Sequence, residues 1–104
     1  MSGYRYRITV EGLSDKKGEP LDLSPVSFEV ENHDEILSLI EKMKARDDLG
    51  FDTNTATSFT VGLKLFSEVM MENRKHPLFE PLRHSFRDFM MLLKQGRAKP
   101  DSEE

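Results

Sequence analysis

The chain has 104 residues, a length that suits one domain with a single hydrophobic core. It contains no cysteine, which excludes disulfides, thiolate catalysis and zinc–thiolate or iron–sulfur sites. The formal net charge of −4 argues against general nucleic-acid binding, and no run approaches the roughly 20 apolar residues that cross a bilayer. The first seven residues carry charge without a following apolar segment, so no signal peptide is expected. We therefore expect a soluble, cytoplasmic protein with no membrane partner.

Two stretches near the N-terminus alternate between apolar and polar residues, as strands with one buried face do. They cover residues 4–11 and 26–31. One antiparallel register places charges opposite charges and apolar residues opposite apolar ones, the arrangement that stabilises neighbouring strands. It consists of the pairs Arg7–Glu29, Arg5–Glu31, Ile8–Phe28 and Tyr6–Val30. We predict this register for an N-terminal β-hairpin.

The first helix is expected directly after the second strand. Asn32 and Glu35 have the spacing of a capping box, in which each side chain bonds the backbone of the other residue. An apolar face follows from Ile36 to Met43, and basic residues crowd the last turn, where cations suit the helix dipole. The pattern predicts a helix over about residues 33–46.

Two further helices are predicted on either side of a proline-containing break. The first begins within Thr53–Ser58 and runs to about Lys75, and the second runs from about Pro81 to Gln95. Their apolar stripes are Phe59, Leu63, Phe66 and Met70, then Leu82, Phe86, Phe89, Met90 and Leu93. We interpret both stripes as core, which leaves few large apolar residues for chemistry.

These elements predict an α+β fold, in which an N-terminal antiparallel β-hairpin is followed by three α-helices. The last two helices form an antiparallel helical hairpin. One domain is expected over residues 1–96, with Gly96 as the C-cap of the last helix, and a disordered polar tail over residues 97–104.

Three runs of the sequence resemble a known family. They are VGLKLFSEVM at residues 61–70, HPLF at residues 76–79 and YRITV at residues 6–10. The family consists of small bacterial proteins known only as a domain of unknown function, and the resemblance extends over roughly residues 4–96. It implies a bacterial single-domain protein and, since the family has no assigned activity, no particular chemistry.

No constellation of catalytic, cofactor-binding or metal-binding residues is visible. The three histidines lack the HExxH spacing, and the acidic loop near Asp48 departs from the calcium-loop template. GxSxG, P-loop and GxGxxG motifs are absent as well. We expect no cofactor and no metal, and we favour a non-catalytic protein. An enzyme with an unrecognised site remains an alternative.

The last predicted helix is basic. From residue 74 to residue 99 there are seven Lys and Arg against two acidic residues. Arg83, Arg87 and Lys94 cluster within roughly 40° of one another on that helix, which would suit an anionic ligand. The simpler alternative is a basic helix that lies on its own acidic body.

Six methionines are many for a chain of this length. Met71 and Met91 point away from the predicted stripes, as does Leu92, and exposed methionine is typical of adaptable binding surfaces. A wider core is the alternative. Our leading hypothesis is a small binding or regulatory module. Its partner would be an unidentified protein or a second copy, in a homodimer joined by sheet edges or by these helix faces.

Overall fold

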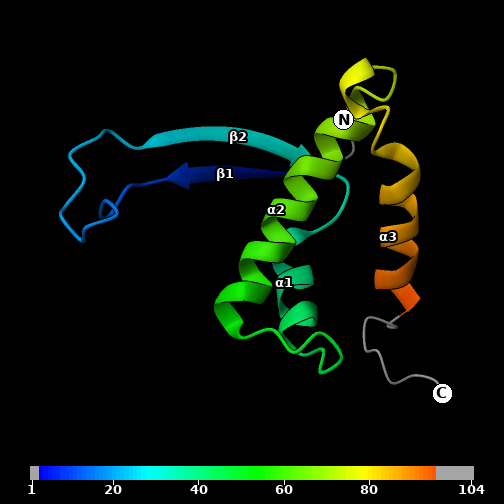
Figure 1. Cartoon of the computed structure of the whole chain (residues 1–104), viewed down its shortest axis with the longest axis horizontal. Helices are drawn as coiled ribbons and strands as arrows, with labels where there is room; N and C mark the ends of the chain where they lie inside the picture. Colours follow the sequence, from blue (N-terminus) through cyan, green and yellow to red (C-terminus); the bar gives the residue numbers. More distant parts are fainter. Residues whose placement is uncertain (1–2, 96–104) are drawn as a thin grey trace. The chain divides into compact units, whose positions relative to one another are not determined.

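The computed structural model describes residues 3–95, and the chain forms two compact units, Met1–Asp34 and Glu35–Glu104. The described part contains an antiparallel two-stranded sheet followed by three α-helices, with one short 3-10 helix between the last two (Figure 1). The α+β prediction is therefore confirmed. Gly96 and the predicted polar tail lie outside the described residues. That the two units make one domain stays a prediction.

The first unit is a hairpin of β1 (Tyr4–Val10) and β2 (Val26–Asn32). Its register agrees with the prediction at every proposed pair, including Arg7 opposite Glu29 and Ile8 opposite Phe28. On the polar face both Arg5 and Arg7 donate to the Glu29 carboxylate, the latter over 2.9 Å. The cross-strand charges that predicted the register are therefore in contact.

The apolar face of this hairpin is not sealed. Val10 and Val26, which face each other at the end of the sheet, are each 61% exposed, and Phe28 is 40% exposed. The expectation that alternation marks a buried face is wrong for these residues. Alternation fixes which side chains share a face, but it does not supply a surface that covers them.

The second unit contains α1 (Ile36–Lys44), α2 (Thr53–Glu72), the 3-10 helix η1 (Pro77–Phe79) and α3 (Arg83–Gln95). In Figure 1, α1 lies beside α2, and α3 runs antiparallel to α2. The small sealed core of this unit consists of Ile36, Ala56, Thr60, Met70, Phe79 and Leu93. The Thr60 hydroxyl donates to the carbonyl oxygen of Ala56 over 2.8 Å, so this buried polar group is satisfied.

The predicted capping box is wrong. Asn32 remains in β2, paired with Tyr4, and its side chain accepts a hydrogen bond from the Asp34 N–H at 3.0 Å. Glu35 is the N-cap of α1 instead, where its carboxylate accepts from the N–H groups of Leu37 and Ser38 at 3.1 Å. Strand pairing holds Asn32 away from the helix, so the helix begins three residues later.

None of these helices, within residues 3–95, combines the length and the apolar character that a membrane span requires.

Candidate functional site

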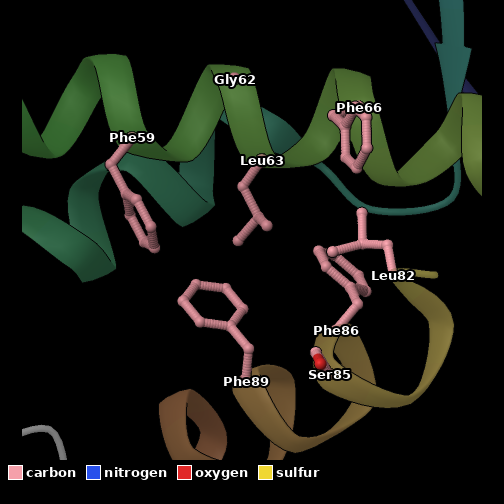
Figure 2. A pocket seen from close by; sticks show the side chains of 8 residues that line it. All are labelled: Phe59, Gly62, Leu63, Phe66, Leu82, Ser85, Phe86 and Phe89. Carbon is pink, nitrogen blue, oxygen red and sulfur yellow. The ribbon is translucent and has the colours of Figure 1, made fainter.

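An apolar groove of about 510 Å³ lies between α2 and α3 (Figure 2). In the figure, the side chains of Phe59, Leu63 and Phe66 point from α2 toward those that rise from α3. The complete lining consists of Phe59, Gly62, Leu63, Phe66, Leu82, Ser85, Phe86 and Phe89. Seven of these eight residues contribute only carbon to the groove or have no side chain, so its surface is almost wholly apolar.

Edge-to-face contacts between phenylalanine rings connect the two helices across this groove. Phe59 and Phe89 meet edge to face with centroids 6.3 Å apart, and Phe66 meets Phe86 at 6.2 Å. Both separations lie toward the long end of the range for aromatic pairs. The helices are thus joined without closing the space between them, and 42% of Phe66 and 41% of Phe89 stay exposed.

The expectation that the two stripes are entirely core is therefore wrong for Phe66 and Phe89. Helical periodicity identifies the faces that α2 and α3 turn toward each other, and those faces were predicted. It carries no information about how closely the two helices approach. Here the distance between them leaves an open, apolar surface.

Gly62 lies in the middle of α2, and a Cβ atom built on it would meet nothing within 4 Å. A glycine inside a helix costs about 1 kcal/mol relative to alanine. Among the glycines of residues 3–95, only Gly18 and Gly50 have a positive φ, so Gly62 is not required by its backbone conformation. Among the described residues, no neighbouring atom explains the missing side chain.

Hydrogen bonds to the backbone anchor α3 near its C-terminal end. The Arg46 guanidinium donates to the Leu93 carbonyl oxygen over 2.9 Å and holds Asp48 through two bonds of 2.9 and 2.6 Å. The hydrogen bond to Asp48 raises the pKa of Arg46, so the guanidinium remains charged. This anchor places one end of α3 against the loop that follows α1.

The start of α3 is anchored as well. Arg83 donates to the Glu80 carboxylate at 2.6 Å and reaches the His76 carbonyl oxygen at 3.4 Å. The Nδ1 atom of His76 accepts a hydrogen bond from the Leu78 N–H at 3.1 Å and so caps η1. Side chains outside the groove therefore hold α3 in place at both ends of the segment that lines the groove.

The groove offers little for catalysis. Its lining contains no titratable side chain, and its one hydroxyl belongs to Ser85. The neighbouring His84 lies 3.6 Å from the Asp88 carboxylate, and adjacent helical positions diverge by about 100°, so that imidazole is directed away from the hydroxyl. The arrangement suits apolar binding rather than proton transfer.

Metal ligands do not gather elsewhere in the described chain. Over residues 3–95, no three His, Asp or Glu side chains stand in an arrangement that could hold a metal ion.

The candidate anion-binding residues lie on the flank of α3 that faces away from Ser85. Arg83 is already paired with Glu80, whereas Arg87 and Lys94 are exposed. The three therefore do not form an equivalent set of free cations. Their role as an anion site stays a prediction.

The candidate interaction residues Met71, Met91 and Leu92 are all exposed, by 42 to 53%. Leu92 follows Ser85 by seven residues and so shares its flank of α3, next to the groove. Met71 and Met91 lie on other faces of their helices. Sequence reasoning missed the groove itself, although an unexplained Gly62 beside an apolar stripe was a signal for it.

Comparison with known proteins agrees with this description. Residues 4–95 match the family described as a domain of unknown function with a solved structure, DUF3861. A crystal structure of a protein of unknown function from Pectobacterium atrosepticum SCRI1043 is similar, with 42% sequence identity and a TM-score of 0.75. The match covers 89% of this chain and 98% of that one. No curated protein matches. Because the family match spans nearly the whole chain, this protein belongs to the DUF3861 family.

Proposed function

We propose that this protein is a small non-catalytic binding module of the bacterial cytoplasm, and that its groove takes the apolar face of an amphipathic helix from a protein partner. The observation that carries this proposal is the groove's lining, which combines six large apolar side chains with a single hydroxyl. An apolar groove is the kind of surface that receives the apolar face of an amphipathic helix.

The shape of the lining favours a helix over a small molecule. On α2 the groove runs from Phe59 to Phe66, a separation of seven positions or roughly 10 Å, which is the length spanned by apolar side chains at i, i+3 and i+7. Small-molecule sites usually place several polar groups that fix the ligand's orientation. Here Ser85 alone could do so. Gly62 leaves room for a bulky side chain of the partner to approach the helix backbone.

A photo-crosslinking amino acid tests the proposal in the native host. At Ser85 it would face the groove, whereas at Arg87, about 160° away around the helix, it would lie on the outer side of α3 and serve as the control. We expect a crosslink from the Ser85 position that maps to the apolar face of a helix in one protein. A synthetic peptide of that segment should then bind the purified full-length protein.

Two variants make the test specific to the groove. Gly62→Leu would fill the groove from within, whereas Gly62→Ala adds one carbon and retains most of the space. We expect the peptide to lose at least tenfold in affinity for Gly62→Leu and to bind Gly62→Ala nearly as the parent. Equal binding to both variants, or crosslinks from the Arg87 position alone, would contradict the proposal.

An anion-binding role is a second candidate. It is favoured by Arg87 and Lys94, both exposed and, over residues 3–95, within ion-pair distance of no acidic side chain. Arg83 would contribute less because it is paired with Glu80. Retention on heparin that Arg87→Ala/Lys94→Ala abolishes would support this role, and elution that does not depend on salt would refute it.

A further inference from the structure

The outer edge of β1 is unpaired over residues 3–95, where its only neighbouring strand is β2. Two-stranded sheets are marginal in water, and further strands with an apolar face, or packing against a helix, are generally required for stability. The hairpin has such a face, formed by Tyr4, Tyr6, Ile8 and Val10 with Val26, Phe28 and Val30, and much of it is exposed. The hairpin therefore has both an open edge and an apolar face that further strands would extend.

The sequence of β1 is complementary to itself about Ile8. We infer that two copies of the chain pair antiparallel through their β1 edges, with Ile8 opposite Ile8 at a twofold axis, to form a four-stranded sheet. This register keeps all apolar side chains on one face. It places Tyr6 opposite Val10, Arg7 opposite Thr9 and Arg5 opposite Glu11 of the second copy, twice in each dimer.

The charges decide among the possible registers. A twofold axis at Arg7 would set the two Arg7 side chains directly against each other, which is destabilising. An axis at Thr9 would also pair Arg7 with Glu11 twice, but it would set Tyr6 and Arg5 opposite Gly12 and Leu13, well beyond the end of β1, and so shorten the pairing. Only the axis at Ile8 combines the longer overlap with two pairs of opposite charge.

The other edge of the hairpin lacks this complementarity. The polar face of β2 carries Glu29 and Glu31 and no cation, so pairing two β2 strands brings carboxylates together without a counter-charge. On β1, by contrast, the Arg5 side chain is 73% exposed even with its bond to Glu29, and Glu11, the residue that follows the strand, is exposed as well. The β1 edge is thus the one suited to a second copy. None of the groove residues takes part in this interface.

Sedimentation over a range of concentrations tests the inference on the full-length protein. We expect reversible dimerisation, and a dissociation constant about tenfold larger for Glu11→Lys, because both opposite-charge pairs become like-charge pairs. Glu19→Lys is the matched control, since it makes the same charge change in the exposed loop between the strands. A protein that stays monomeric at several hundred micromolar would overturn the proposal, as would equal effects of the two variants.

Cysteine crosslinking tests the register independently of the affinity. Because the chain contains no cysteine, Ile8→Cys can form only a disulfide between copies. Residues that face each other on antiparallel strands have Cα atoms about 4.5–5.5 Å apart, within the range of a disulfide. Phe28→Cys, on the same rung and face of the hairpin, is the control for the other edge. We expect a covalent dimer from Ile8→Cys alone, whereas crosslinking of Phe28→Cys alone would overturn the proposed edge.

Discussion

The hairpin and the helical unit carry equally regular apolar patterns, yet the sequence determines their geometry to different degrees. In the hairpin, each residue of β1 faces one residue of β2, so the pair Arg7–Glu29 fixes the whole register. In the helical unit, the stripes fix only which faces of α2 and α3 are turned together. Residue-by-residue pairing between strands thus fixes both which faces meet and how the two strands are aligned. Helical periodicity fixes only which faces meet, and not the distance between the helices.

The largest expected effect is a difference in lost stability between a buried residue of the helical unit and a residue of its groove. Phe79 is buried and contacts Phe66 edge to face, so Phe79→Ala should destabilise the protein by about 3–4 kcal/mol. Phe89→Ala, in the groove, should cost only about 1–2 kcal/mol because its ring is 41% exposed. Urea denaturation of both variants measures the difference. Equal losses would mean that the groove is closed in solution.

Arg46→Ala should cost about 2 kcal/mol, because it leaves Asp48 and the Leu93 carbonyl oxygen without the guanidinium. Amide hydrogen exchange should accelerate in α3 before it does in α2, since the anchor of α3 is lost. Lys44→Ala removes an exposed ion pair with Glu41 and serves as the control, with little expected change. Unchanged exchange in α3 would show that the ring contacts alone hold it.

Gly62→Ala should stabilise the protein by up to about 1 kcal/mol, because a Cβ atom at this position meets no neighbour and alanine favours the helix. Thermal unfolding provides the measurement. Gly50→Ala is the contrasting variant, since its φ of 68° strains any side chain. A loss of stability in Gly62→Ala would show that the space over α2 is already occupied in the free protein.

Glu29→Gln removes the charge that Arg5 and Arg7 share in the hairpin. The expected cost is small, about 0.5 kcal/mol, because all three side chains are about half exposed or more and salt screens the pairs. Comparison of unfolding at low and high salt should show the loss only at low salt. A large effect would show that the register depends on these ion pairs more than on the apolar face.

The smallest expected effect is an acid-dependent one. Asp52 caps α2 by accepting a hydrogen bond from the Thr55 N–H at 2.8 Å, and this bond lowers the pKa of Asp52 from its usual 3.8. The carboxylate therefore stabilises the folded state above pH 3.8, and that contribution is lost as the pH falls through the lower folded pKa. Asp52→Asn should keep the cap and remove this part of the pH dependence. Identical acid titrations of the two proteins would contradict the assignment.

The sequence predicted most of the fold because the elements depend on near neighbours. Both strands, the register and three helices follow from period-two and helical patterns. The cap of α1 was missed because Asn32 is held in β2 by pairing with Tyr4, a contact across 28 residues of chain.

The groove could not be predicted for a similar reason. Its width depends on how α3 is anchored, and one anchor is the bond between Arg46 and Leu93, 47 residues apart in the sequence. Periodicity in the sequence does not indicate a contact between residues so far apart. The candidate residues Met71, Met91 and Leu92 were chosen because they lie off the stripes, whereas the groove is built from the stripes themselves.

The aromatic residues of the chain are divided by type between its two units. Both tyrosines, Tyr4 and Tyr6, belong to β1, all but one of the phenylalanines lie in the second unit, and there is no tryptophan. Intrinsic emission excited near 280 nm therefore comes from the first strand alone. Without any label, the intensity and polarisation of this emission would report on the β1 edge, with no contribution from the helical unit.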